Sequence, residues 1–191
     1  MVLNGGRLLL LLASRDVQCA TQLAMDGNLD LAETLRRLQS LVDEGFVVAF
    51  DDAHGMTVYR LSPRDACPET TAPHRRLLVV ENDAMLRDVV VKVLEHEGYA
   101  IIAVSRPADA VTLLGQVAFD LVITDGFSST PESATFSSID VLESAGTTPV
   151  ALFTAHRVEL DAAQAAGFRD VIAKPFGIEL LWRQVGALLR S

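Results

Sequence analysis

Several short apolar segments between residues 77 and 173 are each followed by a polar or charged residue. The segments and the residues that follow them are 77–80 before Glu81, Asn82 and Asp83, 121–124 before Asp125, 150–153 before Thr154, and 171–173 before Lys174. Short uninterrupted apolar runs are typical of strands buried on both faces of a parallel sheet. Ligands of open α/β sheets bind outside the carboxyl ends of the strands. The sequence therefore predicts that these polar side chains meet at one site.

Residues 76–191 alternate strand and helix signals. We expect strands at 77–80, 100–104, 121–124, 149–153 and 171–173, and helices at 84–97, 107–116, 139–144, 158–166 and 178–189. This alternation predicts an α/β domain with a doubly wound, five-stranded parallel sheet. The expected buried face of the first helix consists of Leu86, Val89, Val90, Val93 and Leu94. Residues 126–138, rich in Ser and Thr, predict a long loop.

Residues 1–62 predict a smaller α+β domain. We expect helices at 7–13 and 16–25, a third helix that begins at Asp30, and a β-hairpin with strands at 46–50 and 57–61. Glu33 follows Asp30 at the spacing of a capping box. The expected apolar stripe of the third helix consists of Leu31, Leu35, Leu38, Leu41 and Val42. Residues 63–75 contain Pro63, Pro68 and Pro73, which predict a semi-rigid linker between two domains.

The composition excludes several classes of protein. The net charge of −9 disfavours unspecific binding to nucleic acid or anionic lipid. The apolar run 8–12 is far shorter than the roughly 20 residues that a membrane-spanning helix needs. Cys19 and Cys67 match no metal-ligand spacing and are typical of reduced thiols. We therefore expect a cytoplasmic protein that does not associate with membranes.

The order of elements in residues 1–62 resembles the winged helix-turn-helix domains of bacterial transcription regulators. The matching segments are Thr-Gln-Leu-Ala (21–24), Leu-Arg-Arg-Leu (35–38), 41–47 and Tyr-Arg-Leu (59–61). In this family the third helix enters the major groove, and the side chains suited to DNA are Arg36, Arg37, Gln39 and Ser40. Against this, the eight carboxylates of residues 1–64 outnumber the six arginines. The charge favours protein contact or dimerisation over DNA binding, and both remain open.

Residues 76–191 resemble the receiver domain of bacterial two-component response regulators. The matching segments are Leu-Val-Val-Glu-Asn-Asp (78–83), Phe-Asp-Leu-Val-Ile-Thr-Asp (119–125), Pro-Val-Ala-Leu-Phe-Thr-Ala (149–155) and Ala-Gly-Phe-Arg-Asp-Val-Ile-Ala-Lys-Pro-Phe (166–176). The resemblance implies a flavodoxin-like fold with strand order 2-1-3-4-5. It also implies phosphorylation by a histidine kinase or phosphotransfer protein, and the possibility of a homodimer.

The resemblance assigns roles that the chemistry of the residues supports. Asp125 corresponds to the phosphoryl acceptor, since a carboxylate can act as the nucleophile in covalent phosphoryl transfer. Thr154 offers a hydroxyl, and Lys174 a compact positive charge, to the phosphoryl group. Mg²⁺ prefers oxygen ligands. The implied ligands are Glu81, Asn82, Asp83, Asp125 and the backbone carbonyl of Phe127.

Two residues depart from the receiver pattern. Asn82 stands where the family has a second acid, so we expect weaker Mg²⁺ binding. Val171 stands where the family has an aromatic residue that moves with the threonine, so that form of the switch cannot operate. The first hypothesis is a response regulator with an N-terminal output domain. The alternative is a degenerate receiver that acts as a scaffold without phosphorylation. A hydrolase is disfavoured because Phe127 cannot protonate a leaving group.

Overall fold

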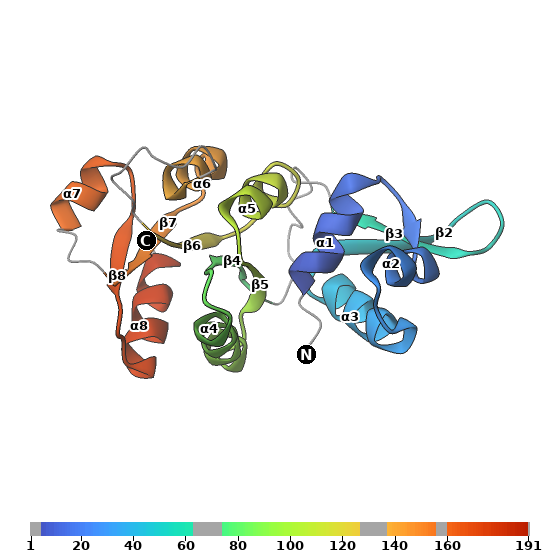
Figure 1. The fold of residues 1–191 in the computed structure, drawn as a ribbon, viewed down its shortest axis with the longest axis horizontal. Helices are drawn as coiled ribbons and strands as arrows, with labels where there is room; N and C mark the ends of the chain where they lie inside the picture. The colour runs from blue at the N-terminus through green and yellow to red at the C-terminus, as the bar shows by residue number, and fades with distance from the viewer. Residues whose placement is uncertain (1–4, 63–73, 127–136, 156–159, 191) are drawn as a thin grey trace. The chain divides into compact units, whose positions relative to one another are not determined.

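The structure is a computed structural model that describes residues 5–62, 74–126, 137–155 and 160–190. The expected linker prolines, Cys67 and Phe127 lie outside these ranges. The chain divides into two compact units (Figure 1). One comprises the residues up to His74 with Gly115–Ala118, and the other comprises Arg75–Leu114 with Phe119–Ser191. No helix within the described ranges has the length and apolar character required to cross a membrane.

The first unit contains helices and a small antiparallel sheet. Its elements are α1 (Gly5–Ser14), β1 (Gln18–Cys19), α2 (Ala20–Gly27), α3 (Leu31–Asp43), β2 (Val47–Asp51) and β3 (Thr57–Leu61). The sheet has the order β1-β3-β2. The helix predicted from residue 16 begins at Ala20 instead, because Gln18 and Cys19 pair with Tyr59 and Val58 of β3. The predicted hairpin is confirmed as β2 and β3, which pair antiparallel.

Helix α3 has the predicted beginning but a different buried face. The Asp30 carboxylate accepts a hydrogen bond from the backbone N–H of Glu33 at 2.9 Å, as expected of an N-cap. Leu38 and Leu41 are fully buried as predicted, but Leu31 and Leu35 are 42% and 44% exposed. Thr34 is buried in their place. Positions 34, 38 and 41 lie on one face at helical spacing, and this face is rotated away from the predicted stripe.

The second unit contains a five-stranded parallel sheet with helices on both of its faces. Its strands are β4 (Arg76–Val80), β5 (Ala100–Val104), β6 (Leu121–Asp125), β7 (Val150–Thr154) and β8 (Asp170–Ala173). Its helices are α4 (Ala84–His96), α5 (Pro107–Leu114), α6 (Ser138–Ala145), α7 (Leu160–Ala165) and α8 (Ile178–Leu188). The strands lie in the order β5-β4-β6-β7-β8, so the first strand of the unit lies between the second and third. Crossovers of this kind require helices between parallel strands.

Two helices of the second unit cover one face of this sheet. Figure 1 shows α4 and α8 on one side of the strands and α5 and α6 on the other. Val90 and Leu94 of α4 pack with Val185 of α8 in the core that covers β4 and β6. Val89, predicted to be buried, is 42% exposed because it lies on the outer side of α4. All the predicted strands are present, and in parallel strands that share a sheet the carboxyl ends lie at one edge.

Candidate functional site

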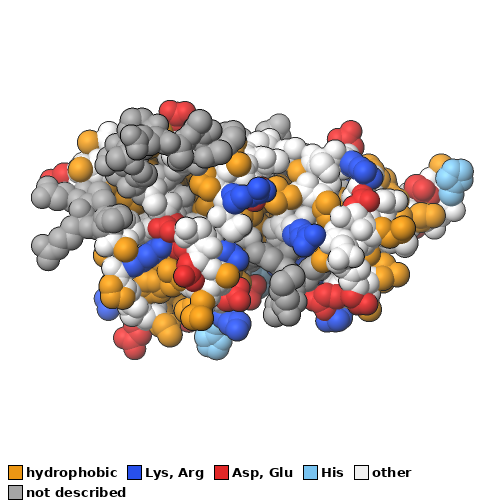
Figure 2. All heavy atoms as spheres, viewed as in Figure 1, with side chains coloured by type: hydrophobic (Ala, Val, Ile, Leu, Met, Phe, Trp, Pro, Cys, Tyr) orange, Lys and Arg blue, Asp and Glu red, His pale blue; other side chains and the backbone are white. Residues whose placement is uncertain are grey.

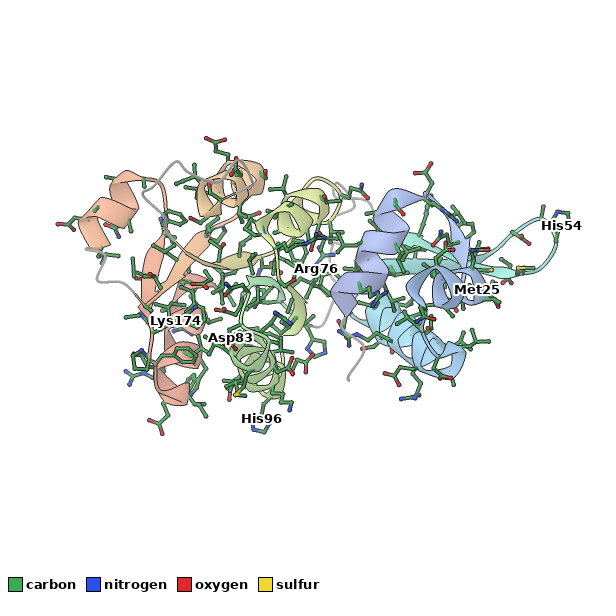
Figure 3. All side chains as sticks on the ribbon, in the orientation of Figure 1. Met25, His54, Arg76, Asp83, His96 and Lys174 are labelled. Carbon is green, nitrogen blue, oxygen red and sulfur yellow. The ribbon has the colours of Figure 1, made fainter. Side chains whose placement is uncertain are left out.

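Lys174 links two carboxylates that lie at the ends of different strands. Its ammonium Nζ lies 2.5 Å from Oε2 of Glu81 and 2.8 Å from Oδ1 of Asp125. Glu81 directly follows β4, Asp125 is the last residue of β6, and Lys174 directly follows β8. The structure thus brings together three of the side chains that the sequence placed at one sheet edge. Figure 3 labels Lys174 between β8 and α8.

These charges are largely removed from solvent. The side chain of Glu81 is 1% exposed, that of Lys174 is 13% exposed and that of Asp125 is 26% exposed. The second oxygen of Glu81, Oε1, accepts a hydrogen bond from the backbone N–H of Asp83 at 2.9 Å. A buried carboxylate needs such partners because its desolvation is unfavourable. Glu81 therefore has a hydrogen-bond partner on each oxygen, while Asp125 presents the more accessible carboxylate.

Thr154 lies beside this ion pair at the end of β7. It is 1% exposed, and its backbone carbonyl accepts a hydrogen bond from the backbone N–H of Lys174 at 2.8 Å. In the parallel pair of β7 and β8, Thr154 is in register with Ala173. The residue with the candidate hydroxyl and the residue with the candidate ammonium are therefore fixed relative to each other by the sheet.

Two other predicted metal ligands, Asn82 and Asp83, do not form a cluster of three acids with Glu81 and Asp125 in the described structure. Asn82 and Asp83 are exposed, and the Asp83 carboxylate accepts a hydrogen bond from the backbone N–H of Leu86 at 2.8 Å. Asp83 is the N-cap of α4, where Figure 3 also marks it. Within the described ranges, no three Asp, Glu, His or Cys side chains are grouped so as to hold a metal ion. The Asp83 carboxylate is thus used as a helix cap in this structure, and its role as a metal ligand stays a prediction.

The two carboxylates that share Lys174 still fit a magnesium ion. Mg²⁺ is commonly bound through one or two carboxylates and keeps several water ligands. Glu81 and Asp125 supply that number, and both already bind one cation, the ammonium of Lys174. The carbonyl of Phe127, the other predicted ligand, belongs to a segment outside the described residues. The donor set of two carboxylates is thus one that suits a hard cation such as Mg²⁺.

Two residues of the site were missed in the sequence. Arg87 donates from Nη1 to the backbone carbonyl of Glu81 at 2.7 Å and of Asn82 at 3.4 Å. Phe153, just before Thr154, places its ring under the ammonium of Lys174. An arginine in the first turn after an acidic strand end was a signal for the first contact. The contact of Phe153 with Lys174 depends on how β7 and β8 pair, and no residue near either position in the sequence indicates it.

The predicted DNA-contacting side chains of α3 are paired within the first unit. Arg36 Nη2 lies 2.6 Å from Oε2 of Glu33, and the Gln39 amide donates to Asp43 at 2.9 Å. Arg37 donates to the Ser40 hydroxyl at 3.2 Å. The Ser40 hydroxyl in turn donates to the carboxylate of Glu44, at the end of the helix. Figure 2 shows acidic and basic side chains next to each other over α3.

Comparison with known proteins identifies relatives of the second unit. The family model of the response regulator receiver domain matches residues 77–185, more than half of the chain. The phosphate regulon transcriptional regulatory protein PhoB of Klebsiella pneumoniae is 31% identical over 121 residues, which cover 61% of this chain and 52% of PhoB. The chain spans about half the length of such curated relatives.

Solved structures show the same fold. A response regulator from Thermotoga maritima matches with a TM-score of 0.53 at 26% identity, covering 62% of this chain and 99% of that one. The receiver domain of the sensor histidine kinase PA1611 from Pseudomonas aeruginosa, solved with magnesium in its active-site cleft, matches with a TM-score of 0.52. It is 22% identical, and the match covers 62% of this chain and 99% of that domain.

Proposed function

This chain belongs to the response regulator receiver family, and from this premise we propose that Asp125 accepts a phosphoryl group from a histidine kinase or a phosphotransfer protein. A carboxylate oxygen of Asp125 forms the new bond to phosphorus. The bond between phosphorus and the donor histidine nitrogen breaks, and that nitrogen keeps the electron pair. Such a protein is a two-component regulator and not an enzyme that turns over a substrate.

The observation that carries this proposal is the contact of Lys174 with Asp125 at 2.8 Å. The transferring group and the nucleophile are both negatively charged, so a fixed positive charge beside the nucleophile lowers their repulsion. Lys174 is 13% exposed, and at such a site electrostatic interactions are stronger than in bulk water. The Thr154 hydroxyl, on the neighbouring strand end, is our candidate donor to a phosphoryl oxygen.

Magnesium is the cofactor that we propose for this site, with Glu81 and Asp125 as its protein ligands. Bound there, the ion would neutralise part of the charge that accumulates on the transferring group. Asn82 can contribute only a neutral amide oxygen, and Asp83 already caps α4. We therefore propose weaker Mg²⁺ binding than in a receiver with two adjacent acids at this strand end.

We propose that the first unit is a winged-helix-like output module. Its order of three helices followed by a β-hairpin, with β1 added to the sheet, supports this assignment. We place the protein in the cytoplasm, where a histidine kinase could reach it. A role in regulating transcription is proposed by analogy with relatives such as PhoB, whose name describes a transcriptional regulatory protein.

The first unit acts, in this proposal, through protein contact or dimerisation in preference to DNA. The donors on α3 that DNA would need are paired with Glu33, Asp43 and Glu44. Binding to duplex DNA over a range of salt concentrations tests this, together with gel filtration over a range of protein concentrations. We expect no salt-sensitive affinity, whereas binding that weakens steeply with salt would support a DNA reader.

Phosphorylation is tested by incubating the full chain with acetyl phosphate and Mg²⁺ and measuring its intact mass. We expect the gain of one phosphoryl group, lost on treatment with hydroxylamine as an acyl phosphate is. Asp125→Asn should abolish the gain. Asp88→Asn, which changes an exposed carboxylate of α4, is the matched control and should retain it.

A chain that gains no phosphoryl group in high Mg²⁺ would overturn the proposal and leave the degenerate scaffold as the better hypothesis. A gain that persists in Asp125→Asn would show that another residue is the acceptor. Beryllofluoride provides an independent check, because it binds as a phosphoryl analogue without a transfer step. Chemical-shift changes at Asp125 and Thr154 on its addition are the expected result.

A further inference from the structure

We propose that the ring of Phe153 is a positioning element that holds the ammonium of Lys174 beside Asp125 during phosphoryl transfer. This inference rests on the proposed phosphorylation of Asp125. In the proposed reaction Phe153 forms no bond to the phosphoryl group. It acts through Lys174 alone.

The geometry is that of a cation–π interaction. Nζ of Lys174 lies over the Phe153 ring, 4.4 Å from its centroid. A cation within about 6 Å of a ring centroid is attracted to the negative face of the ring, and the attraction is larger where water is excluded. Phe153 is fully buried and Lys174 is 13% exposed, so both partners are largely removed from water.

The ring itself is held in place by the sheet and by a second aromatic residue. Phe153 is in register with Asp125 in the parallel pair of β6 and β7. Phe176, two residues after Lys174, packs on it with ring centroids 5.0 Å apart and planes inclined by 51°. The ring is therefore fixed relative to the backbone of the nucleophile, and so is the position of an ammonium that rests on it.

The ring has a role that the two carboxylates cannot fill. A lysine side chain has a flexible four-carbon stem, so holding its ammonium at one point requires several contacts. An incoming phosphoryl group competes with Glu81 and Asp125 for the N–H donors of Lys174. The ring face accepts no conventional hydrogen bond and does not take part in that exchange. Phe153 can therefore keep the ammonium in place while its oxygen partners change.

The contact itself can be observed without any phosphorylation. The chain has two lysines, Lys92 and Lys174, so lysine-selective ¹³C labelling yields a spectrum with two sets of side-chain signals. We expect the ε-protons of Lys174 to be shifted upfield relative to those of exposed Lys92, because they lie near the ring face. Phe153→Leu should remove this shift. Lys174 signals at the positions of Lys92 in the unsubstituted chain would overturn the contact.

The functional role is tested by the rate of phosphorylation with acetyl phosphate. Phe153→Leu should slow it by about 5- to 30-fold, the range between an exposed and a desolvated cation–π contact. Mono-, di- and trifluorinated phenylalanine, introduced at position 153 alone, weaken the negative ring face step by step with little change in size. We expect the rate to fall in the same order. The same series at Phe50 of the first unit, over whose ring Arg60 lies, is the control and should leave the rate unchanged.

The outcomes separate this inference from the function on which it rests. An unsubstituted chain that is not phosphorylated overturns the proposed function, and the role of Phe153 in transfer with it. An unsubstituted chain that is phosphorylated, with equal rates across the fluorinated series at position 153, overturns only the positioning role. If Phe153→Leu does not fold, the fluorinated series still decides, because these side chains preserve the packing of the core.

Discussion

The ion pair between Lys174 and Glu81 should contribute strongly to the stability of the second unit. Lys174→Met keeps most of the aliphatic stem and removes the charge. It leaves the Glu81 carboxylate 1% exposed, with one hydrogen bond from the backbone of Asp83. Removing one partner of a buried ion pair costs about 3–5 kcal/mol, whereas an exposed pair contributes at most about 1 kcal/mol. Because Glu81 retains that one bond, we expect a loss near the lower limit, about 3 kcal/mol.

Urea unfolding followed by tryptophan fluorescence measures this loss of stability in the second unit. Trp182 is the single tryptophan of the chain and lies in α8. With a urea dependence of about 1–3 kcal/mol per M, a loss of about 3 kcal/mol lowers the midpoint by about 1–3 M. Lys92→Met is the matched control, because Lys92 is exposed on α4, and should change stability by less than about 0.5 kcal/mol.

A double-mutant cycle separates the pair from the packing of the lysine stem. Glu81→Gln combined with Lys174→Met removes both charges, and the combined variant should be more stable than Lys174→Met alone. The coupling energy should fall at about 1–3 kcal/mol, as for residues in direct contact. A loss below about 1 kcal/mol for Lys174→Met, or strict additivity in the cycle, would refute the reasoning that this charge is buried and paired.

Three further predictions concern single acidic or amide positions. Asn82→Asp should raise the apparent affinity for Mg²⁺ by about tenfold or more, measured as the Mg²⁺ dependence of phosphorylation, because it adds a charge beside the proposed ligands; an unchanged dependence would place the metal elsewhere. Asp83→Ala should destabilise the second unit by about 1 kcal/mol, whereas Asp83→Ser should retain the stability because serine also caps helices. If phosphorylation lost its Mg²⁺ dependence in both variants, Asp83 would be a metal ligand and not only a helix cap. The backbone N–H and the hydroxyl of Ser137 hold the pKa of Asp140 below its usual range. The stabilisation from Asp140 is therefore complete above its unfolded pKa, near 4, and is lost as the pH falls through the lower folded value; the stability deficit of Asp140→Asn should disappear in acid, and a constant deficit would contradict this.

Three strands of the second unit were predictable because they are buried on both faces. All five residues of β4, β5 and β7 are buried, so an uninterrupted apolar run in the sequence corresponds directly to a strand. The polar residues at the strand ends were predictable for the same reason, since each ends a run. The alternation of strands and helices predicts a parallel sheet, whose strand ends share one edge, whereas the order of the strands was implied only by the resemblance to receiver domains.

Helix faces and short strands were less predictable. The residues Leu31, Leu35 and Val89 are apolar at helical spacing, yet each is more than 40% exposed. The spacing of apolar residues predicts that a helix has an apolar face. Which part of that face is buried depends on the packing partners, and these are distant in sequence. Strand β1 has two residues and forms only because β3 pairs with it. No local preference of Gln18 and Cys19 could have indicated this pairing.

The role of Asp83 shows how one residue type can satisfy two patterns. Three consecutive polar residues after a strand resemble a metal-ligand cluster, but a helix begins directly after Asp83. Its carboxylate is therefore used for the backbone N–H of Leu86, an interaction that stabilises the start of α4. The capping preference of aspartate was a readable signal that competed with the metal hypothesis.

The charges at the strand ends determine how strongly this site attracts Mg²⁺ and repels an incoming phosphoryl group. Glu81 and Asp125 bring two negative charges and Lys174 one positive charge, while Asn82 brings none. Compared with a site that has an acid at position 82, repulsion of an incoming phosphoryl group is smaller and attraction of Mg²⁺ is weaker. Lys174, held between the two carboxylates and the ring of Phe153, then supplies a larger share of the positive charge. The phosphorylation of Asp125 should accordingly depend less steeply on Mg²⁺, and more on Lys174, than in the Asn82→Asp variant.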